Sequence, residues 1–399
     1  MATQGPSSAL FFDTINAYQR TEALRAAIEL DLFSLVAAGR QTASELAEAC
    51  RAAPRGVRIL ADYLTILGFL RKHGDRYELT DDAKVFLDRK SPAYVGDAAR
   101  FMLAPELRES FHQLTAAVRR GGTAVSDEGT VSHDNPIWVE FARAMAPLMQ
   151  MPAQLLAGLV GGEARQPLHV LDVAAGHGLF GITIADRYPQ ALVTALDWPN
   201  VLAVAEENAR RAGVAERYAL RPGSAFDVAW GGPYDVVLLT NFLHHFDIPT
   251  CEQLAARAHA ALAPGGRALT LDFIPEPDRV TPPSTATFAL VMLATTARGD
   301  AYTFVEFQAM FARAGFLRSE FHALPPTTQQ AVVSYKRALN NNFSSSWACH
   351  EAKSCSSTSA IPVAASAAGP PHQDSELPWT GRARLTYNRT TYGDHTACL

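Results

Sequence analysis

Apolar residues recur at helical spacing through much of the first ninety residues. Between 21 and 39 their spacing places them on one face of a helix, which predicts one amphipathic helix: Leu24, Ala27, Ile28, Leu32 and Leu35. Gly39 follows where a C-terminal cap would lie. Thr42 and Glu45 have the spacing of a capping box for a second helix, and Pro54 suits the first turn of a third.

The segment 70–80 has a different pattern, with alternating residues on either side of a Gly-Asp pair. This predicts two short strands, and three helices followed by such a pair form a winged helix. The third helix of a winged helix can read DNA, but here it offers only Arg55 and Arg58 before the apolar run ILADYLTILGFL. A helix that is apolar almost all round is usually buried, so we expect packing against a partner chain rather than against DNA.

Further helices are predicted between 91 and 165. One stretch carries large side chains near helical spacing: Trp138, Phe141, Met145, Met149 and Leu155. Most such stripes pack into a core, but these side chains could instead roof an apolar pocket. In that interpretation Trp138, Phe141, Met145 and Met149 are substrate-pocket candidates, together with Met292 in a later apolar stretch.

Short apolar runs alternate with helical segments from 168 to 336. The predicted strands include LHVLDVA, ALVTALD, YDVVLLT and RALTLDFI, with helical segments such as NVLAVAEENARRAG between them. This alternation predicts a doubly wound α/β sheet.

The pattern ends near residue 338. Residues 338–399 are rich in Ser, Thr, Asn, Gly and Pro without an apolar period, which predicts a disordered tail or sequence from outside the proper reading frame. Cys349, His350 and Cys355 form an incomplete ligand set that matches no standard zinc pattern. The sequons at Asn342 and Asn388 carry little weight without a secretory signal.

Composition agrees with a folded protein of two domains. The chain has 399 residues, 48% hydrophobic and 19% charged, and its net charge of −5 gives no bulk attraction for nucleic acid or an anionic membrane. Only Cys50 and Cys251 lie within the first 340 residues, no run is apolar enough to cross a bilayer, and the N-terminus lacks the signal-peptide pattern. We therefore expect a soluble cytoplasmic protein.

The stretch VLDVAAGHGLFG leads from a predicted strand through a turn into a helix. Gly176, Gly178 and Gly181 satisfy G-x-G-x-x-G, and Asp197 follows Gly176 by 21 residues. This spacing is that of dinucleotide-binding proteins, so a nicotinamide or flavin enzyme is one interpretation. The match alone is weak.

An S-adenosylmethionine site is the other interpretation of this loop. The pattern is then acidic-x-Gly-x-Gly-x-Gly, which Asp172, Ala174, Gly176 and Gly178 fill with one Gly-to-Ala change. A pyrophosphate prefers a helix N-terminus without a nearby carboxylate, whereas an ammonium and a sulfonium favour one. Asp197 can accept hydrogen bonds from both ribose hydroxyls of either cofactor, and it could also cap the next helix.

The end of the predicted sheet favours the second interpretation. The turn Pro264-Gly265-Gly266 leads into a fifth strand, and residues 314–336 read as helix, strand, loop and strand. A sheet that finishes in an antiparallel hairpin is usual for methyltransferases and not for dehydrogenases.

From about residue 10 to 337 the chain resembles the caffeic-acid-type O-methyltransferases of plants and bacteria. The resemblance rests on LDVAAGHGLFG, ALDWPNV, RPGSAFD, LLTNFLHHFD, LAPGGRALTLDF and GDAYTFVEFQAMFARAGF, in this order. It implies S-adenosylmethionine as cofactor, a homodimer and four parts: a winged-helix dimerisation domain at 10–95, a helical linker with substrate-pocket helices at 96–165, a methyltransferase domain with a Rossmann-like sheet at 166–337 and a tail without counterpart at 338–399.

The resemblance also assigns a cofactor site. Gly176 and its neighbours would contact the methionine part and Asp197 the ribose. In the adenine segment the plant pattern has Asp in place of Ser224 and Met in place of Ala225, so recognition would fall to Ser224, Phe226 or backbone groups. The candidate cofactor-binding residues are Asp172, Ala174, Gly176, Gly178, Asp197, Trp198, Ser224, Ala225, Phe226 and Asn241.

The family's catalytic histidine follows the fourth strand and precedes Asp-Trp. His244 takes that position, with His245 and Phe246 after it, while the two orienting acids of the family map to Asp272 and Ala301. The resemblance implies that His244 is a general base oriented by Asp272; the alternative is a structural histidine at a strand end. Adjacent strand residues point to opposite faces, so we expect His245 to face away and the pair to bind no metal.

The predicted function is methyl transfer from S-adenosylmethionine to a hydroxyl of a small, aromatic acceptor of secondary-metabolite type. An imidazole, with a pKa near ~6.5, suits the deprotonation of a phenol with a pKa near ~10. The altered adenine segment and the lost acid leave one alternative, an S-adenosylmethionine-binding relative that performs hydroxylation or decarboxylation.

Overall fold

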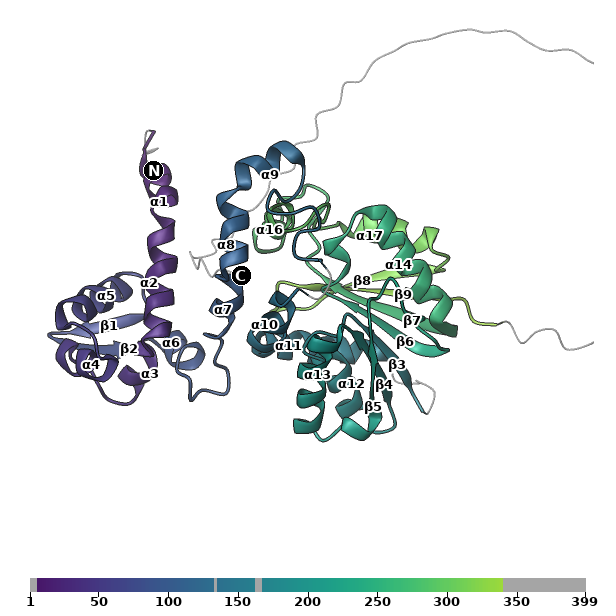
Figure 1. Ribbon diagram of the computed structural model, residues 1–399, viewed down its shortest axis with the longest axis horizontal. Coiled ribbons are helices and arrows are strands. Elements are labelled where there is room, and N and C mark those ends of the chain that lie inside the picture. The colour runs from purple at the N-terminus through teal and green to yellow at the C-terminus, as the bar shows by residue number, and fades with distance from the viewer. Residues whose placement is uncertain (1–5, 133–134, 162–166, 340–399) are drawn as a thin grey trace, which may run out of the picture. The chain divides into compact units, whose positions relative to one another are not determined.

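A computed structural model describes residues 6–132, 135–161 and 167–339 of the chain (Figure 1). From residue 340 onwards, the tail predicted for 338–399 lies outside the described residues, and so do its cysteines and sequons. Within the described ranges, no helix combines the length and the apolar character needed to cross a bilayer. The predicted cytoplasmic location stays a prediction.

The N-terminal region consists of helices and a two-stranded wing. Its elements are α1 (Ala9–Ile15), α2 (Ala17–Glu29), α3 (Leu32–Ala37), α4 (Ala43–Cys50), α5 (Pro54–Ile66), β1 (Leu70–His73), β2 (Arg76–Leu79) and α6 (Asp81–Phe86). The strands pair antiparallel from Leu70↔Leu79 to His73↔Arg76, as the alternation predicted. Buried apolar residues from the helices and the wing share one core: Ala27, Leu32, Phe33, Leu46, Val57, Ala61, Leu64, Leu70 and Tyr77.

Two local predictions in this region are confirmed. Thr42 Oγ1 accepts a hydrogen bond from the Glu45 N–H at 3.3 Å, and Glu45 Oε2 accepts one from the Thr42 N–H at 2.9 Å. This is the reciprocal capping box. Pro54 occupies the first turn of α5, where its missing N–H leaves no hydrogen bond unmade.

One other prediction in this region is wrong. The single helix expected over 21–39 is divided into α2 and α3, because Asp31 adopts a left-handed conformation with φ 54° and its carboxylate accepts from Arg89 Nε at 3.0 Å. Within the single chain, the third helix leaves Ile59 and Ile66 43% and 78% exposed, and its expected packing against a partner chain stays a prediction.

A run of helices leads to the main sheet. These are α7 (Ala98–Met102), α8 (Pro105–His112), α9 (Leu114–Arg120), α10 (Ile137–Ala144) and α11 (Ala146–Ala157), followed by the 3-10 turn η1 (Gly158–Val160). The stretch with the candidate pocket residues is therefore helical, as predicted, and Met145 lies at the junction of α10 and α11.

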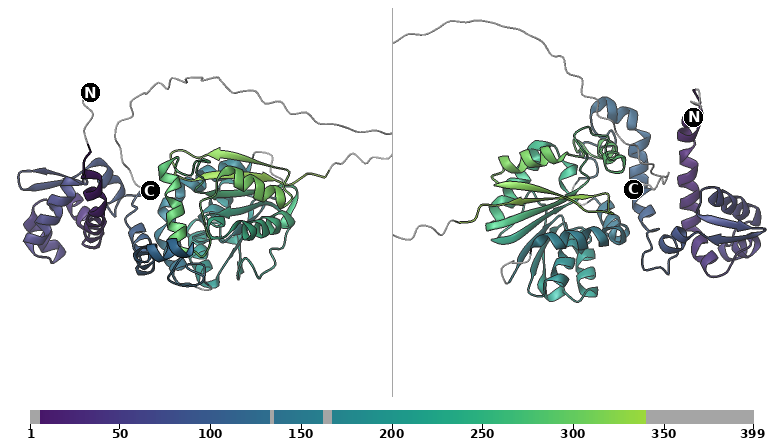
Figure 2. Two further views of the ribbon diagram at one scale, coloured as in Figure 1. Left: turned by 90° about the horizontal axis from the view of Figure 1, so that it is seen from above. Right: turned by 180° about the vertical axis from the view of Figure 1, so that it is seen from behind.

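Seven strands form one mixed sheet in the order β5-β4-β3-β6-β7-β9-β8. The remaining elements are β3 (His169–Val173), α12 (Leu179–Arg187), β4 (Leu192–Asp197), α13 (Pro199–Arg211), η2 (Ala215–Arg217), β5 (Tyr218–Pro222), β6 (Tyr234–Thr240), η3 (Leu243–His245), α14 (Ile248–Ala261), β7 (Leu262–Asp272), α15 (Pro283–Ala286), α16 (Phe288–Thr295), α17 (Phe304–Arg313), β8 (Arg318–Ala323) and β9 (Gln330–Tyr335). Strands β3 to β7 are parallel, while β9 is antiparallel to both β7 and β8. This confirms the predicted hairpin, which forms one edge of the sheet in Figure 2.

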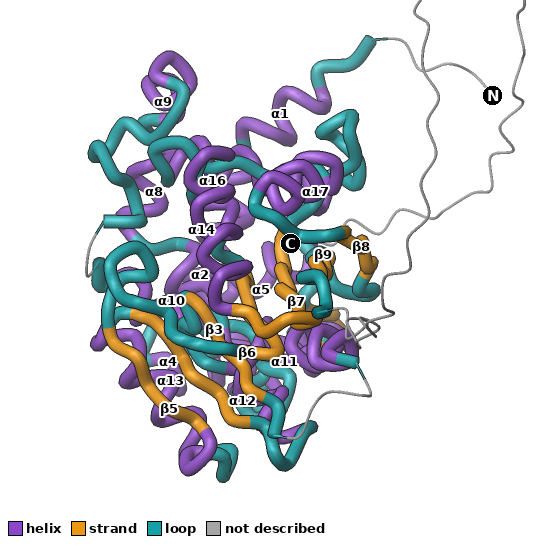
Figure 3. Tube along the Cα trace, turned by 90° about the vertical axis from the view of Figure 1, so that its right-hand side faces the viewer, coloured by secondary structure: helices purple, strands orange, loops and turns teal. Residues whose placement is uncertain are grey.

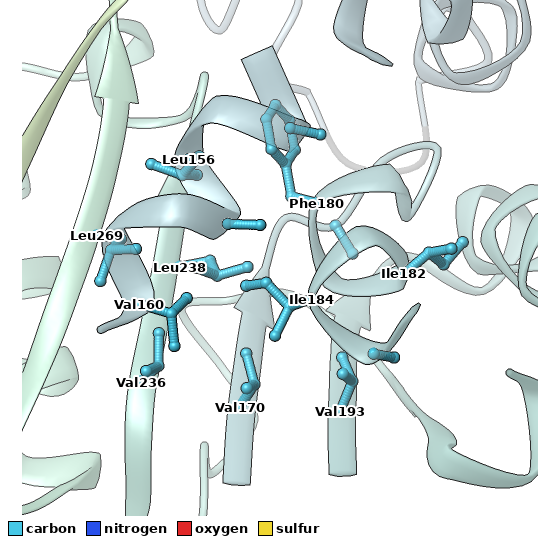
Figure 4. Close-up of a cluster of buried hydrophobic side chains, with 14 of the residues drawn as sticks. Leu156, Val160, Val170, Phe180, Ile182, Ile184, Val193, Val236, Leu238 and Leu269 are labelled. Carbon is cyan, nitrogen blue, oxygen red and sulfur yellow. The ribbon is translucent and has the colours of Figure 1, made fainter. Parts of the chain in front are cut away.

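Helices cover both faces of this sheet (Figures 1 and 3). On one face, α11 and α12 bury side chains such as Leu156 and Ile184 against Val170, Val236 and Leu238 (Figure 4). On the other face, α14 and α17 pack on the alternate residues of the same strands. Strand order reverses between β3 and β6, and in doubly wound sheets ligands bind at the carboxyl ends of the strands at that point.

Candidate active site

The carboxyl ends of the central strands carry most of the predicted site residues. Asp172 lies near the end of β3, Asp197 ends β4, Asn241 follows β6 and Asp272 ends β7. Parallel strands bring these positions to one edge of the sheet. The predicted residues therefore meet at one edge of the sheet, which is the candidate site.

The loop after β3 depends on glycine for two different reasons. A Cβ on Gly178 would lie 2.7 Å from Tyr218 Oη, and one on Gly181 would lie 2.8 Å from Val193 Cγ1, so both glycines permit α12 to pack closely. Gly176, with φ 58°, is different: the nearest atom to its Cβ position is Phe141 Cε1, at 3.8 Å. There the positive φ, and not a lack of space, is what favours glycine.

The carboxylate of Asp197 accepts two backbone hydrogen bonds, one of them from the glycine loop. Its Oδ2 accepts from the Gly176 N–H at 2.8 Å, and its Oδ1 accepts from the Trp198 N–H at 2.7 Å. A carboxylate has lone pairs left after two such bonds, so ribose hydroxyls can still donate to it. Trp198, not Asp197, is the N-cap of α13, which corrects the alternative capping interpretation. Burial raises the pKa of Asp197 to about 6.

Asp172 is placed differently from the expectation. Its side chain is completely buried, and Oδ2 accepts from the Gly181 N–H at 3.1 Å. Burial raises its pKa to about 8, against the lowering effect of that bond. A buried and largely protonated carboxyl bonds to the backbone of α12 instead of facing a ligand. The expected attraction between this carboxylate and the cationic groups of the cofactor therefore gains no support from the geometry. Ala174, in the same loop, has φ 54°, a conformation that suits the glycine of the family pattern better.

The expected adenine segment forms a turn after β5. Ser224 Oγ accepts from the Phe226 N–H at 3.1 Å, and Ala225 is buried with its carbonyl accepting from Trp230 Nε1. Phe226 is 43% exposed, and its ring meets Phe246 edge-on at 5.2 Å between centroids. Of these residues, Phe226 presents the surface best suited to a flat base.

The two histidines lie on a 3-10 turn rather than on a strand. β6 ends at Thr240, Asn241 adopts φ 52°, and η3 then carries both residues. The ring centroids of His244 and His245 are only 4.3 Å apart. The prediction that the two side chains face opposite ways is therefore wrong, because strand alternation ends before they are reached.

His244 is paired with the mapped carboxylate. Its Nδ1 lies 2.6 Å from Asp272 Oδ1, and the two residues are only 4% and 1% exposed. The Phe273 N–H donates to the same oxygen at 2.8 Å and fixes the carboxylate. A carboxylate at Nδ1 favours the tautomer with its proton there, which leaves Nε2 as the basic atom.

The mapped position of the second acid is occupied by Ala301, which carries no carboxylate. Ala301 is fully buried, and the neighbouring Asp300 N–H donates to the His244 carbonyl at 3.0 Å. The carboxylate of Asp300 is turned towards Arg279, 3.3 Å away. Among the described residues, Asp272 is thus the carboxylate that bonds to the His244 ring.

Aromatic rings surround the histidines. Phe288 of α16 lies edge-on to His244 at 4.8 Å and stacks on Phe273 at 4.0 Å. Trp138 lies edge-on to His245 at 5.1 Å and contacts Phe141 at 5.6 Å. Sequence reasoning missed Phe273 and Phe288 as individual residues, although Phe273 directly follows the mapped Asp272.

The other pocket candidates occupy varied positions. Met149 Sδ lies 3.6 Å from Asn241 Nδ2 and so reaches the site. Gln329, a buried residue that the sequence did not single out, donates to Asn241 Oδ1 from the loop before β9. Met292 is buried within α16, and Met145 is half-buried at its helix junction. Across the described ranges, no group of three or more His, Cys, Asp or Glu is arranged to hold a metal ion.

Strand order, glycine loop and carboxyl-end site together define the class I methyltransferase architecture. Comparison with known proteins then gives the family: residues 130–317 match the O-methyltransferase domain, and residues 12–89 match the O-methyltransferase dimerisation domain. The chain belongs to the S-adenosylmethionine-dependent O-methyltransferase family, which acts on small molecules. These matches do not favour the alternative of a non-methylating relative.

Individual relatives agree with this assignment. The tetracenomycin polyketide synthesis 8-O-methyl transferase TcmO of Streptomyces glaucescens is 30% identical over 75% of this chain and 88% of its own. Mouse acetylserotonin O-methyltransferase is 29% identical over 77% and 83%. A crystal structure of a candidate O-methyltransferase from Nostoc punctiforme is 54% identical over 83% of this chain and 100% of its own, with a TM-score of 0.81. Human N-acetylserotonin methyltransferase with S-adenosylmethionine, at 22% identity, 85% and 100% coverage and TM-score 0.74, shares the fold.

Proposed function

We propose that this enzyme methylates a hydroxyl of a flat aromatic acceptor, with His244 as general base and Asp272 as its orienting carboxylate. The observation that carries this proposal is the buried bond of 2.6 Å between His244 Nδ1 and Asp272 Oδ1, set among aromatic rings. The sequence predicted these two roles, and the geometry is compatible with both.

The donor side has groups that suit S-adenosylmethionine. Gly176 leaves room where a Cβ would stand, Asp197 keeps lone pairs for ribose hydroxyls, and Phe226 offers an exposed ring to the adenine. Ser224 and Asn241 add polar groups at the rim of the same strand ends. When bound, S-adenosylmethionine supplies an electrophilic methyl group on a sulfonium.

The acceptor side would orient a hydroxyl and take up its proton. With its Nδ1 engaged by Asp272, His244 has Nε2 available to accept the proton of the acceptor as the new bond forms. The negative charge of Asp272 stabilises the imidazolium that results. His244 and Asp272 are both nearly fully buried, and surroundings with little water favour a reaction that consumes a cation and a developing anion.

The flat acceptor is inferred from the shape of the walls. Phe273, Phe288 and Trp138 present ring faces and edges next to the histidines. Aromatic rings prefer such offset or edge-on partners at centroid distances of about 4.5–7 Å. The names of two relatives above refer to tetracenomycin polyketide synthesis and to acetylserotonin, which agrees with a small organic acceptor here.

The same proposal includes a homodimer formed through the N-terminal region. This region matches a dimerisation domain, and four large apolar side chains of α1 are more than half exposed: Leu10, Phe11, Phe12 and Ile15. Exposed apolar clusters of this kind are typical of protein interfaces. Light scattering of the purified protein should give twice the chain mass, and a monomer would contradict this part of the proposal.

Transfer of a labelled methyl group tests the function directly. The enzyme would be incubated with methyl-labelled S-adenosylmethionine and a panel of hydroxylated aromatics, with matching methyl ethers and anilines as negative acceptors. We expect label only in hydroxylated compounds. His244→Ala should lower kcat by about 10²–10⁴-fold, the usual worth of a general base, while S-adenosylmethionine still binds.

His259→Ala is a matched control, since His259 lies on α14 and its ring packs against Phe316, away from the described site. Its turnover should equal that of the wild type. Near-full turnover by His244→Ala would refute the general base, and label in no hydroxylated acceptor would refute the proposed function as a whole.

A further inference from the structure

The turn that carries Phe226 is fixed by hydrogen bonds from side chains to its backbone. This turn follows β5 and covers residues 224–230. Backbone carbonyls along most of its length accept such bonds: those of Ala225, Phe226, Val228, Ala229 and Trp230. Holding a turn in one conformation costs conformational entropy, and these bonds offset that cost. The conformation of the turn therefore depends on the residues that supply them.

Arg257, on α14, contacts this turn at several points. Its guanidinium donates from Nη1 to the Phe226 carbonyl and from Nη2 to the Val228 carbonyl, the second at 2.5 Å. It also lies over the Trp230 ring, 5.2 Å from the ring centroid. Trp230 Nε1 in turn donates to the Ala225 carbonyl at 2.9 Å. Arg257 thus holds the turn directly at and after Phe226, and through Trp230 before it.

The guanidinium group suits this task. Its planar fork presents several donors in a fixed geometry, so it can bond two acceptors at once, whereas the ammonium of lysine is a compact point charge. Arg313, by contrast, also lies against α14 but pairs with the carboxylate of Glu252 on that helix at 2.5 Å. The hydrogen bonds of Arg257 go instead to the backbone of the turn.

The ring of Phe226 is the part of the turn that a ligand can reach. It is 43% exposed, whereas Ala225 beside it is buried. The ring contacts Phe246 with the two ring planes at 80°. Phe246 is itself held, because its carbonyl accepts a hydrogen bond from Tyr302 Oη at 2.5 Å. The exposed part of the Phe226 ring therefore keeps one direction as long as the turn keeps its conformation.

We propose that Arg257 is a positioning residue for the cofactor: it fixes the turn 224–230 so that the ring of Phe226 stacks on the adenine of S-adenosylmethionine. This inference rests on the proposed function, in which Phe226 offers its ring to the adenine. Arg257 itself does not contact the cofactor and acts only through the turn. It takes no part in methyl transfer, so its loss weakens cofactor binding and leaves the chemical step unchanged.

Calorimetric titration of the full chain with S-adenosylhomocysteine measures this effect without an acceptor. Arg257→Met keeps an unbranched stem next to the Trp230 ring and removes both hydrogen bonds. We expect its dissociation constant for S-adenosylhomocysteine to rise about fivefold or more, because stacking of a base on an aromatic ring contributes at least about that factor to binding. Arg257→Lys, which retains the charge and one donor group, should restore part of the affinity.

A double variant shows whether Arg257 acts through Phe226. Phe226→Ala removes the ring, and we expect it to weaken binding at least as much as Arg257→Met does. If the turn is the link, the variant with both changes should bind S-adenosylhomocysteine no more weakly than Phe226→Ala alone, because effects that share one contact do not add.

Steady-state kinetics with a hydroxylated acceptor gives an independent readout. In Arg257→Met the KM for S-adenosylmethionine should rise, while kcat at saturating S-adenosylmethionine stays within about twofold of the wild type. A residue that only stabilises the fold would not produce this division. Arg313→Met is the matched control, since it removes an arginine that contacts α14 but not the turn, and it should leave both constants at their wild-type values.

The outcomes are distinct. An unchanged dissociation constant in Arg257→Met, additive losses in the double variant, or a lower kcat with an unchanged KM for S-adenosylmethionine would each overturn the inference. If Arg257→Met does not fold, Arg257→Lys takes its place, and a wild-type dissociation constant would then overturn the inference. Failure to label any hydroxylated acceptor of the wider panel would instead overturn the proposed function, while the binding measurements would still decide the role of Arg257.

Discussion

The carboxylate of Asp272 can be removed in two ways that separate charge from position. In Asp272→Asn the amide oxygen can take the place of Oδ1, which accepts from His244 Nδ1 at 2.6 Å and from the Phe273 N–H at 2.8 Å. The amide nitrogen then takes the place of Oδ2, a buried atom without a partner in the described chain. This variant therefore keeps the tautomer of His244 and loses only the negative charge. Asp272→Leu removes the negative charge and also the hydrogen bond that fixes the tautomer of His244.

The expected losses follow from this geometry. A hydrogen bond to a charged group is worth about 1.5–3 kcal/mol and a neutral one about 0.5–1.5 kcal/mol. The difference, about 1–2 kcal/mol, predicts that kcat falls about 5- to 30-fold in Asp272→Asn. In Asp272→Leu the ring is no longer oriented, so we expect the larger loss of about 10²–10⁴-fold that accompanies loss of a general base.

The dependence of turnover on the pKa of the acceptor phenol tests whether Asp272 acts through the basicity of His244. Methyl transfer from labelled S-adenosylmethionine would be measured with a series of substituted phenols of decreasing pKa. An acidic phenol is already ionised and needs no base, so the deficit of both variants should shrink along the series. Asp278→Asn, at an exposed carboxylate that caps a loop after β7, is the control and should match the wild type.

Two results would refute the reasoning. If Asp272→Asn turned over within about twofold of the wild type, the charge would contribute nothing to the barrier. If the deficit of both variants were the same for acidic and ordinary phenols, Asp272 would act on structure or binding rather than through the basicity of His244.

Three further predictions concern stability. Gly178→Ala places a Cβ 2.7 Å from Tyr218 Oη at φ 76°. Urea denaturation should therefore show that the free energy of unfolding falls by about 1–3 kcal/mol, and calorimetry should show weaker S-adenosylmethionine binding. In the control Gly213→Ala, φ is 72° but the space is open, so cofactor binding should stay intact. Thr42→Ala removes the capping box and should cost about 1 kcal/mol of unfolding free energy without lowering kcat; an unchanged midpoint would show that the box is unimportant. The pKa of Asp172 rises from an unfolded value near ~3.9 to about 8. Its contribution is therefore complete at low pH and is lost as pH rises towards 8, whereas Asp172→Asn should lack this fall, and equal pH profiles would contradict the buried proton.

Much of the fold could be read from local patterns. Alternating apolar runs predicted the α/β sheet, and the capping-box spacing of Thr42 and Glu45 predicted a helix start. The helix, strand, loop and strand expected over 314–336 predicted the closing hairpin. Each of these signals is carried by residues close together in sequence. The same kind of reasoning failed over 21–39, because apolar spacing continues through Asp31 although the backbone there is left-handed.

The candidate site was predicted less completely. Gly176, Asp197 and Asp272 could be proposed from the sequence because each ends a strand or follows one. The orientation of His245 was wrong, because strand alternation was extended four or five residues beyond the end of β6 at Thr240. Phe288 and Gln329 gave no local signal, since each reaches the site only through contacts with residues far away in the chain.

The sequence by itself determined which elements form, which residues stand at the carboxyl ends of the strands and, through the resemblance, the family. Tertiary structure decided which of those residues meet. The bond between His244 and Asp272 joins residues 28 positions apart, and it exists because β6 and β7 are parallel neighbours with their ends at one edge. Burial decided the rest: Asp172 lies beneath α12 and keeps a proton, while His245 lies beside Trp138 and stays neutral. Charge state and orientation depend on all the atoms around a group, and those come together only in the folded chain.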